Sequence, residues 1–328
     1  MLFGVQAYWA QIFLIPKKVM KTVEQICRTF LWTGAVTVSK KALVAWSNVC
    51  LPGAAGGLNI ANLCIWNLAA ILKLLWDINR KKDRLWVQWV HSYYIKKGDI
   101  TQVQIPKTAS WVVRKVLESR QQLITRLQSH GTIHQQLGNV QQGGHFQSIK
   151  LTWKHLVLHP KIHPRYKFIL WLAIQKRLAT VERLQKFGIN VPPDCAFCGQ
   201  HLQTFSHLFF ECDVTRRIWR RLLQWMGYNR QIQDWENEVK WMSQVARRRG
   251  GQVEITSCLF DMTVHKVWQA RNFIRFQQKP FLSEVIIKDI VIHIHIRGRN
   301  SIAWRECLQR EQLVQAAGTQ IVHVFGYK

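Results

Sequence analysis

Four residues in the second half of the chain have the types and the spacing of a zinc site. Cys195 and Cys198 are followed after eight residues by His207 and, after four more, by Cys212. Two cysteines separated by two residues turn both thiolates toward one ion, and Gly199 directly after them supplies the permissive backbone for that turn. Three sulfurs and one imidazole complete a tetrahedral shell, which leaves no position for water or substrate. The spacing therefore predicts one structural zinc ion rather than a hydrolytic centre.

The alternative is that these thiols are free and buried. The remaining cysteines argue for the metal because they are scattered without any pair spacing, so the four-residue pattern stands apart from them. They are Cys27, Cys50, Cys64, Cys258 and Cys307. Unpaired cysteines also favour a reducing compartment inside the cell.

The segments around the ligands supply the elements that must position them. A Pro-Pro pair before the site ends any preceding helix, and Asp213 is placed to cap a new helix over residues 214–226, closed by Gly227. Cys212 then lies at a helix N-terminus, where the helix dipole favours a thiolate.

A second helix is predicted before the site, over residues 165–187. At about 100 degrees per residue its apolar residues fall in one sector, and the basic Lys176 and Arg183 lie opposite. The apolar residues are Trp171, Ile174, Leu178 and Val181. One face of this helix is expected to pack against the zinc site, and the other to be solvated and basic.

The helix after the site repeats this division. Its apolar stripe consists of Ile218, Trp219, Leu222, Leu223 and Met226, and its basic stripe of Arg216, Arg217, Arg220 and Arg221. No carboxylate stands among these four arginines, so we expect their guanidinium groups to repel one another unless an anion binds. We interpret the basic stripe as a phosphate-contacting surface, and a solvated basic face is the alternative.

A family resemblance is carried by the run LWLAIQKRLATVERLQKFGI, by CAFC and HLFFEC, and by Trp219. These residues resemble the zinc-binding domain near the C-terminus of plant LINE-type (non-LTR) retrotransposon reverse transcriptases. Residues 8–120 resemble the segment after the polymerase core of the same family, through Pro16-Lys17-Lys18, Ala45-Trp46 and Gly56-Gly57-Leu58. The resemblance implies that the region helps hold template RNA and target DNA during reverse transcription.

Composition points to the same class of partner. The chain has 328 residues, 48% of them hydrophobic, and a net charge of +28. Residues 1–150 carry 19 basic against 5 acidic residues, and residues 151–328 carry 27 against 13. A basic excess over the whole length indicates a polyanion, most simply RNA or DNA. A membrane surface fits less well because no basic amphipathic anchor or lipidation motif is present.

The first half of the chain is predicted to be helical. A helix follows Pro16 and ends at Gly34, and the turn around Gly53, Gly56 and Gly57 is read as a tight loop because its spacing matches no phosphate-binding motif. Residues 63–78 are apolar around most of the circumference but are interrupted by polar residues, which predicts a buried helix rather than a membrane span.

Cations and aromatic rings alternate in the segment RKKDRLWVQWVHSYY, residues 80–94. Lys81, Lys82 and Arg84 have the character of phosphate contacts, and the rings that follow have the character of base platforms. A solvated helix end beside a packed aromatic stripe fits the segment equally well.

Polymerase chemistry is not expected from this chain. Two-metal catalysis needs closely spaced carboxylates, which the family supplies partly as an adjacent Asp-Asp pair. The eight aspartates are all isolated from one another: Asp77, Asp83, Asp99, Asp194, Asp213, Asp234, Asp261 and Asp289. We therefore predict no catalytic residue and no enzyme activity of its own, and a reverse transcriptase core supplied by another chain is one candidate partner.

The predicted fold is mainly α: a helical, thumb-like segment resembling the region after the palm (1–120), a Gln/Gly-rich tether (121–148), a small helical zinc-binding domain (149–228) and a helical or mixed C-terminal extension (229–328). His293 and His295, which alternate with isoleucines in the extension, fit a strand or a helix and are taken as structural. The predicted function is zinc-supported binding of RNA or DNA in the nucleus or cytoplasm, with no membrane and no small-molecule substrate. A protein-interaction module and an inactive transposon remnant are the alternatives.

Overall fold

The structure is a computed structural model that describes residues 15–120, except 36, 38, 40, 41, 97, 99 and 101, and residues 151–317, except 279 and 280. Within these ranges the protein is mainly helical and has no strand, which confirms the predicted fold class. The chain forms two compact units, Met1–Lys150 and Leu151–Lys328. The predicted tether falls outside the described residues, and the bounds of the four predicted segments stay predictions.

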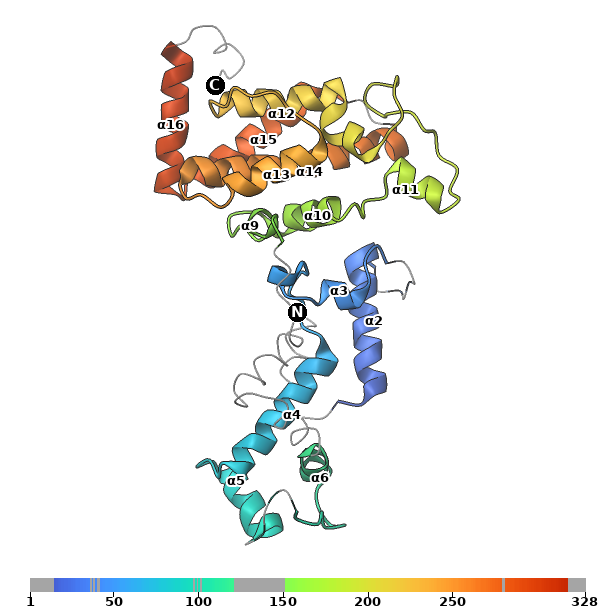
Figure 1. Ribbon diagram of the computed structural model, residues 1–328, viewed down its shortest axis with the longest axis vertical. Coiled ribbons are helices and arrows are strands. Elements are labelled where there is room, and N and C mark those ends of the chain that lie inside the picture. Colours follow the sequence, from blue (N-terminus) through green and yellow to red (C-terminus); the bar gives the residue numbers. More distant parts are fainter. Residues whose placement is uncertain are drawn as a thin grey trace. The chain divides into compact units, whose positions relative to one another are not determined.

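The first unit is built from helices joined by loops (Figure 1). Its elements are α2 (Lys17–Thr33), α3 (Trp46–Val49), η1 (Gly53–Ala55), α4 (Leu63–Asn79), α5 (Leu85–Val90), η2 (His91–Ile95) and α6 (Trp111–Glu118). α2 begins after Pro16 and ends at Gly34, whose φ of 70° and N–H bond to the Phe30 carbonyl close the helix as predicted.

The centre of the first unit is α4, against which α5 and α6 pack. Asn62 caps its N-terminus by accepting a hydrogen bond from the Ile65 N–H at 3.2 Å. Ile71, Leu72 and Leu75 are buried with residues of α5, η2 and α6, which confirms the predicted buried helix. None of the helices in the described ranges is long and apolar enough to cross a membrane.

The second unit contains the ligand set and a larger helical core (Figure 1). Its elements are α9 (Lys154–Val157), α10 (Pro164–Ile174), α11 (Val181–Lys186), η3 (His207–Glu211), α12 (Asp213–Trp225), α13 (Trp235–Val245), α14 (Gly251–Gln277), α15 (Ser283–Gly298) and α16 (Ile302–Ala317). His293 and His295 both lie in α15, so the choice between strand and helix resolves to helix.

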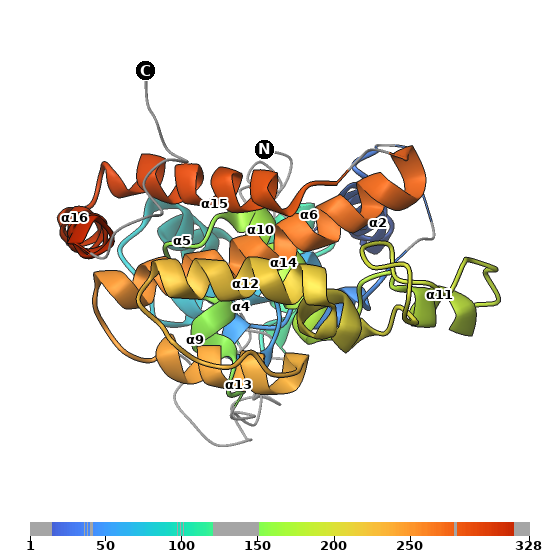
Figure 2. The same ribbon diagram turned by 90° about the horizontal axis from the view of Figure 1, so that it is seen from above.

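The long helix α14 organises this unit, because α10, α12, α13, α15 and α16 all contact it. Figure 2 shows α12, α14 and α15 running alongside one another. Aromatic side chains fill the space between η3, α12, α13 and α14. The Phe210 ring lies 5.7 Å from both Trp235 and Phe260, and the Trp219 ring lies 5.5 Å from Phe260. The helices that hold the ligand set therefore share one core with residues far beyond it in the sequence.

The single helix predicted over residues 165–187 is wrong, because the structure has two helices there. α10 ends at Ile174, and Lys176 adopts a left-handed φ of 52°. The Lys176 N–H donates a hydrogen bond to the Ala173 carbonyl, and the Arg177 N–H donates one to the Leu172 carbonyl. These two bonds are the pattern of a Schellman C-cap. The chain then turns and restarts as α11 after Thr180, while Leu178 and Val181 stay buried as the apolar pattern predicted.

Candidate metal centre

Cys195 and Cys198 lie on a loop whose backbone folds back on itself. The Cys195 N–H donates to the His201 carbonyl at 2.8 Å, and an isolated bridge joins Asp194 to Leu202. Within the loop, the Gly199 N–H donates to the Cys195 carbonyl at 2.9 Å with φ at 65°, a conformation that costs glycine little. The turn predicted after the Cys-x2-Cys pair is therefore present and points both thiols to the same side.

His207 and Cys212 come from the two ends of one short element. His207 opens the π-helical turn η3, and the Cys212 N–H closes it by donating to the His207 carbonyl at 2.9 Å. Cys212 is also the N-cap residue of α12. The prediction that Asp213 caps this helix is wrong: Asp213 is its first helical residue, because the extended backbone of Cys212 already occupies the cap position.

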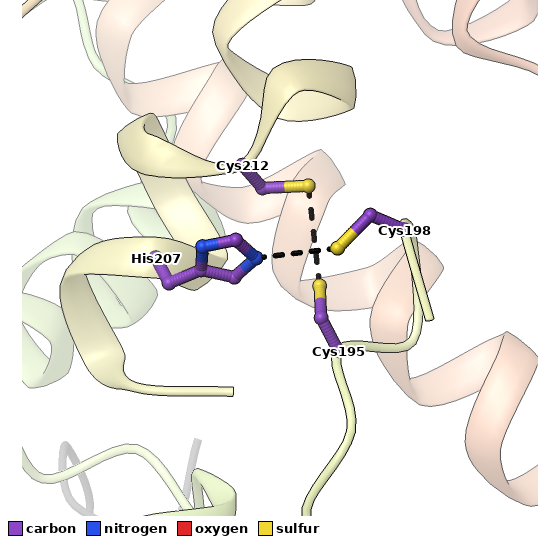
Figure 3. A group of neighbouring side chains, drawn as sticks. All are labelled: Cys195, Cys198, His207 and Cys212. Carbon is purple, nitrogen blue, oxygen red and sulfur yellow. Dashed lines mark hydrogen bonds between the residues drawn. The ribbon is translucent and has the colours of Figure 1, made fainter. Parts of the chain in front are cut away.

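The four side chains converge on one point (Figure 3). Their ligand atoms all lie within 4.8 Å of one another, with 3.9 Å between the sulfurs of Cys195 and Cys212 and 3.4 Å from the Cys198 sulfur to His207 Nε2. Ligands about 2.3 Å from a central zinc are separated by about 3.8 Å at the corners of a tetrahedron. The set therefore fits one zinc ion, as the spacing predicted.

The burial of the four ligand side chains and the protonation of their thiols agree with a closed metal site. Cys195, His207 and Cys212 are buried, and Cys198 is half-buried. The hydrogen bond between Cys195 and Cys212 lowers the pKa of the Cys195 thiol to about 4, against burial, which raises it. The same bond raises the pKa of Cys212, so the pair favours one thiolate, and zinc binding requires that both sulfurs lose their protons.

Residues outside the ligand set hold the loop in place. The Arg275 guanidinium, on α14, donates to the Pro192 carbonyl at 2.9 Å, to Gln203 Oε1 at 3.0 Å and to the Asp194 carbonyl. On the other side, Glu182 of α11 accepts a hydrogen bond from the Phe205 N–H at 3.0 Å. Sequence reasoning missed Arg275 and Glu182, because neither belongs to a spacing motif and their partners are distant along the chain.

The basic stripe of α12 divides into two engaged and two free arginines. Arg216 donates to the Phe210 carbonyl at 3.0 Å and pairs with Asp213 at 3.6 Å, while Arg221 pairs with Glu284 of α15. The expectation that no carboxylate neutralises the stripe is therefore wrong for these two. Asp213 lies one turn earlier on α12, and Glu284 is 63 residues away in sequence but adjacent in space.

Arg217 and Arg220 remain exposed, with no hydrogen bond or ion pair to any residue that the structure describes. They lie three residues apart and therefore on the same side of α12. Of the predicted phosphate contacts in the second unit, these two are the ones whose guanidinium groups stay available.

The other predicted contacts in this unit have protein partners. Lys176 forms an ion pair with Glu236 at 2.6 Å, although both side chains are more than half exposed. Arg183 donates to the Lys176 carbonyl at 3.3 Å and lies over the Phe187 ring at 5.5 Å. These bonds position Lys176 and Arg183 next to the turn between α10 and α11.

Lys81, Lys82 and Arg84 belong to the first unit and lie after the end of α4. Lys82 and Arg84 both pair with the buried Asp77, at 2.8 and 3.1 Å, and Lys81 is exposed with a left-handed φ of 48°. The structure brings these three residues together, but in a different unit from the metal centre.

Comparison with known proteins addresses the ligand set directly. Residues 139–219 match the family model for zinc-binding in reverse transcriptase. All four ligands lie within this match. The segment that carries the metal centre is thus similar to a family defined by zinc binding, and the geometry and the match agree on a zinc ion.

A curated relative is similar over a shorter stretch. A putative ribonuclease H protein of Arabidopsis thaliana is 35% identical over 100 residues, which cover 30% of this chain and 16% of that protein. This chain therefore aligns with a small part of a much longer protein. No solved structure matches it significantly.

Proposed function

We propose that this chain is part of a LINE-type retrotransposon reverse transcriptase and that its second unit is a zinc-built module that binds RNA or DNA. The observation that carries the proposal is the placement of Arg217 and Arg220. Both are exposed on α12, and α12 begins at the ligand Cys212. Zinc binding thus fixes the start of the helix that presents two unpaired guanidinium groups to solvent.

Charge supports a nucleic acid as the partner. The chain carries +28, and phosphate groups bind guanidinium and ammonium groups while releasing condensed counterions. Arginine suits this role because its planar fork donates two parallel hydrogen bonds to one phosphate. A nucleic-acid partner places the action of the chain in the nucleus or cytoplasm.

We propose further that the chain has no polymerase centre of its own. Its aspartates are all isolated from one another in sequence, and the adjacent Asp-Asp pair that the family uses is not among them. A closed shell of three sulfurs and one imidazole stabilises a fold and offers no site for substrate. Reverse transcription by such a chain requires a polymerase core from elsewhere.

A protein-interaction module is the second candidate, and one surface favours it. Val285, Ile292 and Ile296 are 58%, 41% and 54% exposed on α15. Their spacing of seven and four residues places them on one side of the helix, a pattern by which helices bind apolar grooves. In this case the basic charge is incidental to function.

Zinc content and binding of single-stranded RNA, measured together on the purified chain, test the proposal. We expect one zinc per chain and an affinity whose logarithm falls with log salt by about 0.7 per phosphate contacted. The Arg217→Gln, Arg220→Gln double variant should keep its zinc and make this slope shallower by about 1.4. Repeating the titrations with single-stranded DNA distinguishes the two nucleic acids.

Two further double variants serve as controls. Arg299→Gln with Arg305→Gln removes the same charge from exposed positions near α16 and should leave the slope unchanged. Cys195→Ser with Cys198→Ser should lose both zinc and binding. If zinc is bound but RNA affinity is absent, or is the same in every variant, the site is only structural and the interaction module becomes the better explanation.

A further inference from the structure

The aromatic side chains around α5 divide into a packed pair and an exposed pair. Trp86 and Tyr94 pack against the core that α4, α5 and α6 share. Trp89 and Tyr93 face outward, with 42% and 69% of their surfaces exposed. We call Trp89 and Tyr93 the aromatic ledge. Large rings are normally buried because they dominate core energetics, so two exposed neighbours on one helical face are unusual.

The ledge is held in a fixed geometry. The rings of Trp89 and Tyr93 lie 6.1 Å apart and within 25° of parallel, and the edge of Tyr94 packs against Trp89 at 5.2 Å and 83°. Tyr93 belongs to the π-helical turn η2, which directly continues α5. Such turns are rare and are frequent at functional sites. Two nearly parallel rings with substantial exposed surface are thus held next to each other at the surface of the first unit.

A basic cluster lies directly before the ledge in the chain. Residues 80–84 contain four cations and one carboxylate, and the buried Asp77 pairs with two of the cations. Two positive charges therefore remain uncompensated. Lys82 and Arg84 stay 40% and 57% exposed despite their ion pairs, and Lys81 is exposed. The ion pairs fix the two side chains without removing them from solvent.

We propose that the aromatic ledge stacks bases of a single-stranded nucleic acid while Lys81, Lys82 and Arg84 contact its phosphates. A flat ring binds the face of any base, and cations beside it bind the backbone, which is the usual construction of sites for single strands. The positive charge favours this occupant over an apolar protein groove, since such a groove has no anion to pair with the uncompensated cations. The inference deepens the proposed function, on which it rests, by adding a second site in the other unit.

The test compares two strands with the same phosphates. One is a single-stranded oligonucleotide with bases and the other is an abasic strand of equal length. Each stacked base is worth about tenfold in affinity, so the full chain should prefer the strand with bases by about tenfold or more. Trp89→Leu with Tyr93→Leu keeps apolar surface but removes the ring faces, and it should abolish most of this preference. Trp89→Phe with Tyr93→Phe keeps ring faces and should retain it.

Control variants separate the ledge from the zinc-built unit. Trp111→Leu removes another exposed tryptophan, 49% exposed on α6, and should change nothing. Arg217→Gln with Arg220→Gln should weaken binding to both strands equally. Circular dichroism melts of every variant verify that each one folds.

The outcomes are distinct. Loss of base preference in the leucine variant alone supports the ledge. If the leucine variant keeps its preference for the strand with bases, the ledge does not stack bases, and a protein partner becomes the better explanation of the exposed rings. The proposed function of the second unit is unaffected by this outcome if the arginine variant still weakens binding. If the leucine variant of the ledge changes binding and the Arg217→Gln, Arg220→Gln variant does not, base stacking on the ledge is supported and nucleic-acid binding by the zinc-built unit is contradicted. Absence of binding to either strand overturns both.

Discussion

The indole N–H of Trp219 donates to the carboxylate of Glu238 at 2.9 Å, and both side chains are fully buried. Arg230 pairs with the same carboxylate at 2.6 Å, and the Gln233 N–H donates to it at 2.9 Å. A buried charge with several hydrogen bonds is stable only while its partners remain. Glu238 therefore joins α12 to α13 through the tryptophan that follows the metal centre.

Removing this carboxylate should destabilise the second unit strongly. We expect Glu238→Ala to lower the free energy of unfolding by about 3–5 kcal/mol, because it leaves the guanidinium of Arg230 and the indole N–H of Trp219 unpaired. Glu236→Ala, two residues earlier on the same helix, is the matched control. Its carboxylate is 67% exposed and pairs only with Lys176, so the change should be within about 1 kcal/mol. Equal effects in urea titrations would contradict the role given to Glu238.

Zinc removal should act locally before it acts globally. A chelator should increase amide hydrogen exchange in residues 193–212 and in the first turn of α12 by roughly a hundredfold, because the ligands join the loop to that helix. Amides of α4, in the other unit, should exchange as before. Readdition of one equivalent of zinc should restore protection. Uniform loss of protection across α4 and α12 would mean that the ion stabilises more than its own unit.

Acid should weaken the second unit through His265. This residue is 6% exposed on α14, its ring lies 4.6 Å from that of Tyr166, and burial lowers the pKa of the imidazole from 6.5 to about 4, aided by the positive charges of Arg165 and Lys266. The unfolded chain then binds a proton between these two values and the folded chain does not. Stability should thus fall by about 3 kcal/mol as the pH drops from 6.5 to 4, and this residue should have no effect above that window.

The measurement is a difference between two proteins. Urea unfolding of the wild type and of His265→Phe, both loaded with zinc, cancels the contribution of every other titrating group. The wild type should lose more stability than the variant between pH 6.5 and 4. Parallel curves would show that the imidazole is solvated in the folded chain.

Two glycines of the first unit should respond to alanine for different reasons. A Cβ on Gly57 would lie 2.0 Å from the Leu51 carbonyl oxygen, so Gly57→Ala requires backbone movement and should cost about 3 kcal/mol or more. Gly34 has open space around it but a φ of +70°, so Gly34→Ala should cost only about 1 kcal/mol. Thermal unfolding of the two variants checks this order: Gly57→Ala should lower the melting temperature of the first unit more than Gly34→Ala does.

Much of the metal centre could be predicted because zinc imposes short, ordered spacings on its ligands. Cys195, Cys198, His207 and Cys212 converge as expected, and the helices around Ile71 and Trp219 follow their apolar periodicity. In each case the information is local, and a few turns of sequence contain it.

The errors have physical causes of two kinds. Lys176 ends a helix in a left-handed conformation that normally selects glycine, so the usual residue signal for a break is missing. Arg221 finds its carboxylate on α15, and Arg275 finds its carbonyls on the zinc loop, 83 residues away in the case of Pro192. Such partners depend on how the helices pack and leave no pattern in the sequence around either residue.

The cap residue Cys212 and the ion pair between Arg221 and Glu284 lie toward opposite ends of α12. The helix keeps its direction because its apolar side, which includes Trp219, is buried in the core of the second unit. Arg217 and Arg220 lie between these two ends, so the backbone positions from which their side chains extend are set before any ligand arrives. In the complex that we propose, the helix itself would therefore lose little orientational entropy when a phosphate backbone binds.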